Sequence, residues 1–215
     1  MTALASATSP SVAQGSVVVV PVGSLEQHGP HLPLDTDTVI AQAVAAGVAD
    51  RLGGWCAPAL AYGSSGEHQS FPGTTSIGTP VLTEVLVELA RSVRAWATQL
   101  VLVNGHGGNL QAIRLAVAKL RHERHDVRWL ACSAAGMDAH AGRAETSLML
   151  HLRPESVRLD LAERGNTAPL PALMPHLRSG GVSAVSRNGV LGNPEAASAE
   201  EGRQLLAAMV DGVLL

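Results

Sequence analysis

The stretch SVVVVPVGSLEQHGPHLPLDTD (residues 16–37) decides the fold, because it joins a strand pattern to a cluster of ionisable side chains. It opens with a short continuous run of mostly β-branched residues, which is typical of a strand buried on both faces. A second run of this kind, LVLVN (residues 100–104), leads into the glycine-rich turn GHGGN (residues 105–109). Both runs predict buried strands, and each ends where polar residues begin.

The rest of the chain alternates between strand and helix patterns. Strands are expected over residues 55–61 and 127–132, and helices over residues 38–52, 81–98, 110–124, 144–152 and 194–213. Strands alternating with crossover helices predict an α/β fold, a three-layer α/β/α sandwich with a mainly parallel central sheet. We expect residues 1–15 to form a flexible tail and residues 16–215 to form a single catalytic domain.

Residues 163–194 break the alternation, because Pro, Gly and Ser are scattered through them. We expect this segment to be irregular. Its length of ~30 residues is typical of a functional loop, so a lid and an oligomer contact are both open interpretations.

The composition excludes several classes of protein. Of 215 residues, 15% are charged and 2% are aromatic, while nine are histidines. A net charge of −3 leaves no basic surplus for nucleic acid, and five aromatic residues offer little surface for base stacking. The strand-like apolar run at residues 17–22 is far shorter than the ~20 residues that cross a bilayer. We therefore expect neither nucleic-acid nor membrane partners.

The cellular compartment follows from the cysteines and the N-terminus. Cys56 and Cys132 lie far apart with no Cys-x-x-Cys pattern, which indicates a reducing environment. The first 15 residues lack the basic n-region of a signal peptide. A cytoplasmic location is expected.

Candidate metal ligands follow the predicted strands. Glu26 and His28 are two residues apart, which places both side chains on one face of an extended chain. Asp37 falls at the start of the next helix, for which Thr36 is a candidate N-cap. In open α/β sheets, ligands bind beyond the carboxyl ends of the strands, so these side chains should converge there.

Two further clusters should reach the same edge of the sheet. His106 follows the second buried run, and His140 and Glu145 follow the strand at residues 127–132. Carboxylate and imidazole donors suit a mixed nitrogen and oxygen site for zinc, iron(II) or manganese. His31, His68 and Asn104 are candidates to orient these ligands or contact substrate, and a structural role is equally open for each.

Simpler interpretations exist for each feature taken alone. A single histidine after a strand is more often structural, and Asp35 or Asp37 could serve only as a helix cap. The turn at residues 105–108 could be a phosphate loop, but it lacks the G-x-G-x-x-G and G-x-x-x-x-G-K-[ST] patterns. The set as a whole favours a metal site.

The motifs resemble those of the creatininase family of metal-dependent amidohydrolases. The matching segments are GSLEQHGPHLPLDTD (residues 23–37), NGHGGN (104–109), HAGRAETS (140–147), FPGT (71–74) and GVLGNP (189–194). The resemblance covers about residues 16–213. It implies a creatininase-like α/β/α fold with a dinuclear metal site at the carboxyl edge of the sheet.

The resemblance also assigns roles. It implies that Glu26, Asp37 and His106 hold one ion and that His28, Asp37 and Glu145 hold the other, with Asp37 bridging. It matches His140 to the catalytic histidine of the family. The expected cofactors are two divalent ions per subunit, Zn²⁺ and/or Fe²⁺ with Mn²⁺ as a further possibility, which would activate a shared water. Family members assemble as rings of dimers, so a homo-oligomer such as a hexamer is implied.

Within the family, two segments point to one branch. AYGSSGEHQ (residues 61–69) and DAHAGR (138–143) look most like the branch that acts on the modified mycofactocin precursor peptide and releases its C-terminal Val-Tyr-derived dipeptide. One position departs from creatininase proper, which has an acid two residues after the histidine matched by His106. That position is Gly108 here, which argues against creatininase activity.

Three functions remain as hypotheses. The favoured one is a metal-dependent peptidase acting on the modified precursor peptide. The second is a small-molecule amidohydrolase, such as a creatininase or a formamide deformylase of cofactor biosynthesis. The third is a metal-binding protein without catalysis, which the intact His140 and the complete ligand set disfavour.

Overall fold

A four-stranded parallel sheet forms the centre of the computed structural model, which describes residues 3–212. The strands β1 (Val17–Val22), β2 (Trp55–Cys56), β3 (Gln99–Asn104) and β4 (Val127–Ala131) pair in the order β2-β1-β3-β4. Strands β1 and β3 pair over their whole length, so that Val22 lies opposite Asn104. The loops that follow these two strands therefore begin side by side.

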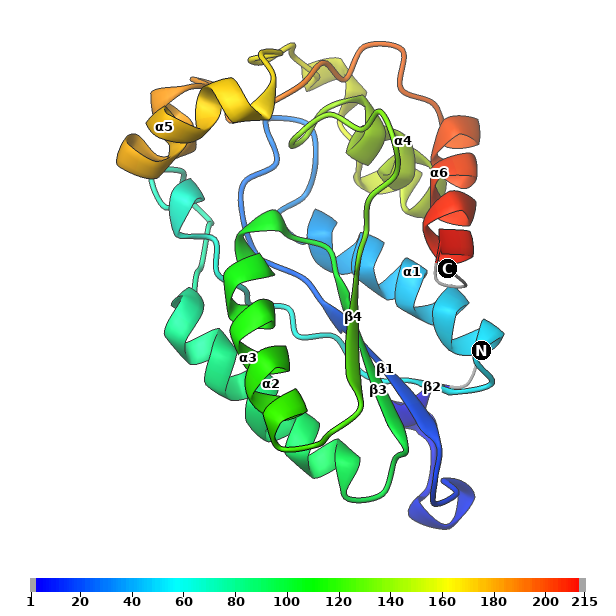
Figure 1. Ribbon diagram of the computed structural model, residues 1–215. Helices are drawn as coiled ribbons and strands as arrows, with labels where there is room; N and C mark the ends of the chain where they lie inside the picture. The colour runs from blue at the N-terminus through cyan, green and yellow to red at the C-terminus, as the bar shows by residue number, and fades with distance from the viewer. Residues whose placement is uncertain (1–2, 213–215) are drawn as a thin grey trace.

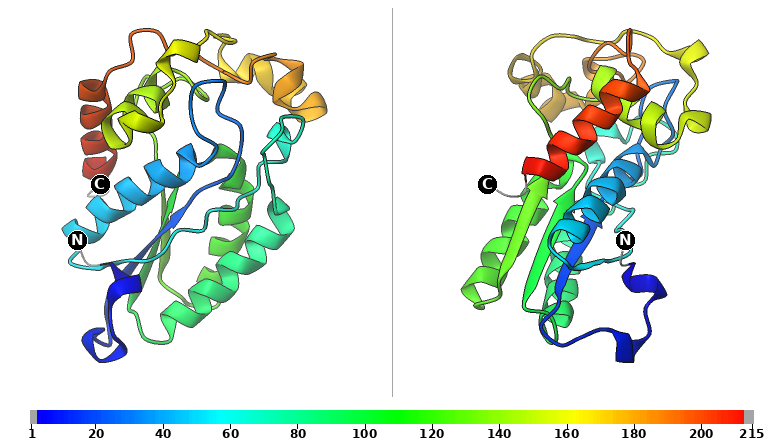
Figure 2. Two further views of the ribbon diagram at one scale, coloured as in Figure 1. Left: turned by 180° about the vertical axis from the view of Figure 1, so that it is seen from behind. Right: turned by 90° about the vertical axis from the view of Figure 1, so that its right-hand side faces the viewer.

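Helices cover both faces of the sheet (Figures 1 and 2). One face carries α1 (Thr36–Arg51), α4 (Arg143–Leu152) and α6 (Ala199–Asp211), and the other carries α2 (Gly78–Arg94) and α3 (Leu110–His122). A further helix, α5 (Leu170–Gly180), lies beyond the carboxyl ends of the strands, at the upper left of Figure 1. The three-layer α/β/α sandwich expected from the sequence is confirmed.

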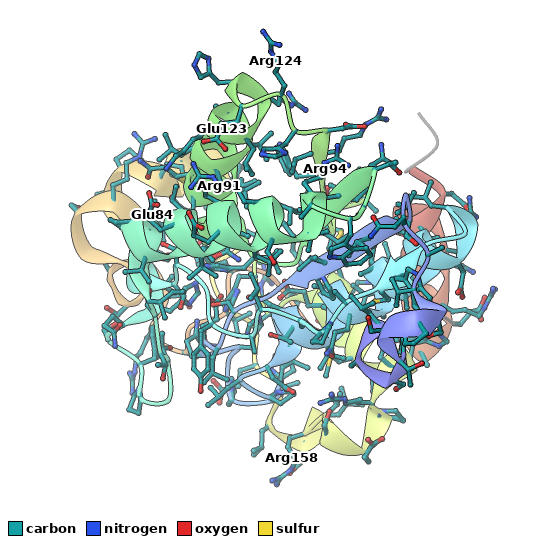
Figure 3. The ribbon with its side chains drawn as sticks, turned by 90° about the horizontal axis from the view of Figure 1, so that it is seen from below. Glu84, Arg91, Arg94, Glu123, Arg124 and Arg158 are labelled. Atoms are coloured by element: carbon teal, nitrogen blue, oxygen red, sulfur yellow. The ribbon has the colours of Figure 1, made fainter. Side chains whose placement is uncertain are left out.

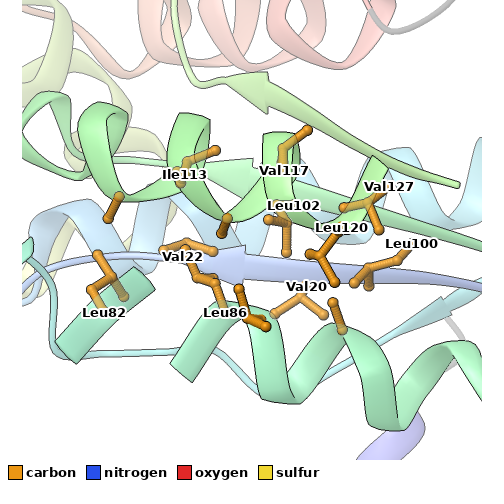
Figure 4. Packing of buried hydrophobic residues seen from close by; sticks show 14 of the residues in the cluster. Val20, Val22, Leu82, Leu86, Leu100, Leu102, Ile113, Val117, Leu120 and Val127 are labelled. Carbon is orange, nitrogen blue, oxygen red and sulfur yellow. The ribbon is translucent and has the colours of Figure 1, made fainter. Parts of the chain in front are cut away.

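The alternation of side chains along β1 builds two hydrophobic cores. Val20 and Val22 point toward α2 and α3, where they pack with Leu86 and Ile113 (Figure 4). Val19 points the other way, into a core formed with α1, α4 and α6. The valine run is buried on both faces, as its continuous apolar pattern predicts.

The predicted elements differ from the structure mainly at their ends. The strand expected over 55–61 ends at Cys56, because Pro58 has no N–H to extend the ladder, although Leu60 makes an isolated bridge to Val22. Helix α1 begins at Thr36, two residues before the expected start, so Asp35 holds the N-cap position and the prediction of Thr36 as the cap was wrong. The Thr36 hydroxyl instead donates to the carbonyl of Pro33.

The segment at residues 163–194 is less irregular than expected, because it contains α5. The C-terminal helix is also shorter than the expected 194–213: α6 starts at Ala199, where Ser198 caps it by accepting from the N–H of Glu201. The expected end at residue 213 lies outside the described residues.

The N-terminal residues contain two short turns. Residues 4–6 and 9–11 form single 3-10 turns, and Leu4 packs against the core beneath α2 and α3. The division between a tail and a domain at residue 15 stays a prediction. Within residues 3–212, no helix has both the length and the apolar character required to cross a membrane.

Ion pairs link α2 and α3 at the surface. The guanidinium of Arg91 donates to both carboxylate oxygens of Glu123, at 3.0 Å from Nε and 2.5 Å from Nη2. Figure 3 shows these two side chains together on this outer face. Surface pairs contribute little to stability, so the hydrophobic cores hold the layers together.

Candidate metal centre

The loop between β1 and α1 brings the first three predicted ligands together. Glu26, His28 and Asp37 are almost fully buried, with 0%, 0% and 2% of their surface exposed. Gly105, at the end of β3, lets the backbone approach them, because a Cβ there would lie 2.4 Å from the carbonyl oxygen of Asp37. The sequence places a glycine where β3 must pass close to α1.

Asp37 lies between two histidines from the loops that follow different strands, β1 and β3. Its Oδ1 is 3.1 Å from His28 Nε2, and its Oδ2 is 3.3 Å from His106 Nδ1. The same His106 nitrogen is 3.1 Å from Glu26 Oε2. The carboxylate of Asp37 therefore faces His28 with one oxygen and His106 with the other, which is the position expected of a bridging ligand.

The loop after β4 supplies His140, and the first turn of α4 supplies Glu145. Glu145 Oε2 is 3.9 Å from His28 Nε2 and accepts a 2.6 Å hydrogen bond from the N–H of Ala141. Ala141 has the left-handed φ of 51°, uncommon for a residue other than glycine, and this turns its N–H toward the carboxylate. The rings of His140 and His28 lie 4.3 Å apart between centroids. The structure thus brings all five predicted ligands and His140 together.

The donors in this cluster fit divalent cations. Two buried carboxylate oxygens, Glu26 Oε1 and Asp37 Oδ2, have no hydrogen-bond partner among the described residues. Such orphaned anionic atoms are costly unless a cation or proton compensates them. In three sets of side chains, one donor atom from each lies within 4.8 Å of the others: Glu26, His28 and Asp37; His28, His140 and Glu145; Glu26, His68 and His140.

The buried side chains of the cluster shift one another's pKa values. Burial opposes protonation of His28, but ion pairing with Asp37 outweighs it and raises the pKa of His28 to about 10. Despite its burial, Asp37 has a pKa far below the usual range because of the charges on His28 and His106. Burial raises the pKa of Glu145 to about 7. The buried carboxylates therefore favour positive charge at His28.

His140 differs from the other histidines. Burial, with a smaller contribution from the neighbouring rings of His28 and His68, holds its pKa well below 6.5. A neutral imidazole is able to accept a proton, which is a requirement for a general base.

The three remaining candidates hold parts of the site in place. Asn104 donates to the carbonyl of His106 at 2.7 Å, which closes the glycine-rich turn. His31 Nε2 lies 2.9 Å from the hydroxyl of Thr146 on α4, away from the carboxylates. His68 lies inside the cluster, with its Nε2 3.3 Å from Glu26 Oε1.

Glu67 is a residue that the sequence reasoning passed over. Its Oε1 is 3.4 Å from His106 Nε2, on the opposite side of the ring from the other carboxylates. A Cβ at Gly108 would lie 2.4 Å from that oxygen and 2.3 Å from the carbonyl oxygen of Ser64. Glu67 thus occupies space beside His106 that an acid at position 108 would enter. The segment 61–69 was singled out in the sequence, but nothing in it indicated this contact.

A cavity of about 1420 Å³ opens above the cluster. Asp37, His106, His140 and Glu145 lie at its base, and the loop at residues 133–139 forms part of its wall. Helix α5 forms another part through Leu170, Met174, Leu177 and Arg178. These four positions share one side of the helix, since residues three, four and seven apart lie on one face.

Comparison with known proteins identifies the family of this chain. The family model described as creatinine amidohydrolase matches residues 5–214. The chain belongs to the creatininase family. It is therefore a hydrolase that acts on amide bonds, as its motifs predict. It is 55% identical over 202 residues to the mycofactocin precursor peptide peptidase of Mycolicibacterium smegmatis, covering 91% of this chain and 82% of that protein.

More distant relatives agree with the family assignment. The chain is 33% identical to the creatinine amidohydrolase of Pseudomonas putida, over 92% of this chain and 86% of that protein. A creatininase variant complexed with creatine superposes with a TM-score of 0.82 at 30% identity, covering 98% of this chain and 94% of the other. Related creatininase structures include a Zn-Zn type and a manganese form, so the family is metal-dependent.

Proposed function

We propose that this protein is a metal-dependent peptidase that hydrolyses an amide bond in the modified mycofactocin precursor peptide and releases its C-terminal Val-Tyr-derived dipeptide. The cavity carries this proposal. Its volume of about 1420 Å³ and the apolar side of α5 along its wall suit a peptide segment better than a single small amide. The 55% identity to a named mycofactocin precursor peptide peptidase supports the same substrate.

The metal centre in this proposal is dinuclear. Glu26, Asp37 and His106 would hold one ion, while His28 and Glu145 would hold the second together with Asp37. When bound, divalent ions supply Lewis acidity, which lowers the pKa of water from 15.7 toward ~7 and polarises a carbonyl oxygen. Zn²⁺, Fe²⁺ and Mn²⁺ all suit this donor set, so the metal pair has to be measured.

His140 carries the proton in the proposed reaction. Because its pKa is lowered, it is neutral at pH 7 and can accept a proton from the attacking water. It can then return that proton to the leaving amine. General acid–base catalysis of this kind raises the rate by ~10²–10⁴-fold. Gly108 offers no acid for this transfer, so the proposal assigns the step to His140 alone.

A substrate comparison tests the proposal. Purified protein loaded with Zn²⁺, Fe²⁺ or Mn²⁺ is incubated with the modified precursor peptide, with an N-formyl amine and with creatinine, and the products are identified by mass spectrometry. The proposal predicts a Val-Tyr-derived dipeptide from the peptide and negligible turnover of the small amides. Hydrolysis of creatinine or release of formate, with the peptide left intact, would contradict it.

The small-molecule alternative rests on one observation, the similarity to a creatinine amidohydrolase. The absence of a side chain at Gly108 and the size of the cavity favour the peptide. A metal-binding protein without catalysis would bind metal ions in the same assay and turn over none of the three compounds.

The proposal includes a cytoplasmic homo-oligomer, with a hexamer as one assembly that the family resemblance implies. Light scattering of the purified protein measures its mass in solution, and a monomer would contradict this part.

A further inference from the structure

Gln27 stands between two proposed ligands in the sequence, and its side chain reaches across the site. Only 5% of Gln27 is exposed. Its Oε1 accepts a 2.9 Å hydrogen bond from the N–H of Gly29, and that contact fixes which end of the amide is oxygen. The Nε2 end is 2.8 Å from His68 Nδ1 and 3.0 Å from the carbonyl oxygen of Gly189. Both amide hydrogens therefore have an acceptor.

This geometry assigns the proton on His68. An amide nitrogen only donates, so the His68 Nδ1 that faces it must be an acceptor without a hydrogen. A neutral His68 then carries its hydrogen on Nε2, which is 3.3 Å from Oε1 of Glu26. Glu26 Oε2 already accepts from the hydroxyl of Ser24 at 2.9 Å. The Nε2 hydrogen of His68 thus lies on the side of the other oxygen of the same carboxylate, at ion-pair distance and without a hydrogen bond.

The main chain of Gln27 makes the matching assignment for His140. His140 Nε2 is 2.8 Å from the carbonyl oxygen of Gln27, which only accepts, so this nitrogen carries the hydrogen of the neutral ring. The Gln27 amide, 3.0 Å from the same nitrogen, has both hydrogens directed elsewhere. The nitrogen left with a free lone pair is Nδ1, on the side of Glu26 Oε1 at 3.7 Å.

Gly189 makes room for this amide. It has a φ of 82°, and a Cβ there would lie 1.9 Å from Gln27 Oε1. Two residues later, Leu191 and His140 exchange backbone hydrogen bonds of 2.9 and 3.1 Å. The Gln27 amide therefore also holds the chain segment that runs alongside His140.

We propose that Gln27 is a positioning residue that sets the tautomers of two histidines. Its carboxamide keeps His68 protonated on Nε2, toward Glu26, and its carbonyl leaves Nδ1 of His140 as the nitrogen that accepts and returns the proton. The tautomer assignments stand independently of the reaction, whereas the proton transfer at Nδ1 rests on the proposed function.

Nitrogen-15 NMR of the histidine rings in the Zn²⁺-loaded protein tests the assignments directly. Signals are assigned with His68→Gln and His140→Gln variants. We expect hydrogens on Nε2 of both rings in the unmodified protein. A hydrogen on Nδ1 of neutral His68 or neutral His140 would overturn the proposal without any variant of Gln27.

The variant Gln27→Glu tests whether the carboxamide of Gln27 sets the tautomer of His68. A carboxylate cannot donate to His68 Nδ1, so His68 should move its hydrogen to Nδ1, while His140 keeps its tautomer because the carbonyl of residue 27 remains. Hydrolysis of the peptide should fall by ~10–100-fold in kcat, the range for partners that orient metal ligands. Gln69→Glu, at an exposed glutamine of the neighbouring loop, is the matched control and should change neither signal nor rate.

The variant Gln27→Met keeps the length of the side chain without its donor or a charge, so it covers the case in which Gln27→Glu does not fold. It should leave His68 as a mixture of tautomers and lower kcat. Retention of the Nε2 tautomer of His68 in either folded variant, or an unchanged kcat, would overturn the proposal. If the unmodified protein shows the expected tautomers but cleaves no peptide, the proposed function fails and the tautomer assignment stands.

Discussion

Asp37 is the residue on which both halves of the proposed metal centre depend, because its two carboxylate oxygens face different histidines. Asp37→Ala should remove most bound metal and lower peptide hydrolysis by more than ~100-fold, the upper end of the losses seen for outer partners of a metal site. The hydrophobic cores contain no part of this side chain, so the fold should persist. Metal content by mass spectrometry, activity and circular dichroism measure the three effects.

Asp35→Ala is the matched control for this substitution. Asp35 is two residues away, pairs with Arg153 at the surface at 2.9 Å and faces none of the candidate ligands. Its loss should leave metal content and activity unchanged. Full metal content in Asp37→Ala, or equal losses in both variants, would contradict the role of Asp37.

The buried side chain of His31 should make the stability of the protein depend on pH. Burial, with a smaller contribution from the positive charge of His28, lowers the pKa of His31 to about 4, against ~6.5 in the unfolded chain. Between these values the unfolded state binds the extra proton. The contribution of His31 to the free energy of unfolding should therefore decrease as the pH falls from 6.5 to 4, by up to ~1.4 kcal/mol per pH unit.

Urea denaturation at a series of pH values checks this prediction. His31→Gln should be less stable at pH 7, because it disturbs a buried contact with Thr146, but its stability should change less steeply with pH. Parallel curves for the two proteins would show that His31 does not titrate as expected.

For single residues, the spacing of the motifs was enough to predict that the candidate ligands lie close together. Glu26 and His28 lie on the loop that leads into α1, and Asp37 lies in the first turn of that helix, so their proximity is a local property of the sequence. The contacts of Gln27 and Glu67 could not be predicted, because both depend on loops far apart in the chain. The side-chain amide of Gln27 donates to a carbonyl 162 residues away, and no periodicity in the sequence predicts such a contact.

Among the elements, α5 shows where sequence patterns fail. Pro171 is compatible with the first turn of a helix, but Pro175 lies inside α5 and removes a backbone donor, so the segment resembles a loop. Its position is fixed by tertiary packing: Leu173 joins Val182 and Leu191 in a small separate core. By contrast, β1 and β3 were predicted well because their apolar runs are continuous.

Helix α5 also carries a prediction about substrate binding. Two arginines line the cavity, and Arg143 is already paired with Glu201 at 2.8 Å. Among the described residues, Arg178 has no ion-pair partner, and it follows the apolar side of α5. We expect it to bind the C-terminal carboxylate of the peptide. Arg178→Gln should raise KM by ~10–100-fold, since a charged hydrogen bond contributes ~1.5–3 kcal/mol.

Steady-state kinetics on two versions of the peptide check this expectation. A peptide ending in a C-terminal amide should bind the unmodified protein as weakly as the free acid binds Arg178→Gln. Arg187→Gln is the control, because Arg187 is exposed and lines a different, smaller pocket. An equal KM for acid and amide peptides in the unmodified protein would exclude this contact.

At the scale of the whole molecule, a buried cluster of carboxylates and histidines lies at the carboxyl edge of a parallel sheet, beneath a cavity partly walled by α5. The α/β/α order of layers could be predicted from alternating patterns, because each strand and helix is a local property. The shape of the cavity could not, because it depends on how α5 and the loop at residues 133–139 meet above the sheet.

The central claim is that this cluster hydrolyses the precursor peptide only when metal ions occupy it. The most direct measurement strips the purified protein with a chelator and follows release of the C-terminal dipeptide by mass spectrometry during titration with Zn²⁺, Fe²⁺ or Mn²⁺. The account predicts no cleavage by the stripped protein and full recovery at two ions per chain with at least one of these metals. Undiminished cleavage by the metal-free protein, or recovery complete at one ion per chain, would contradict it.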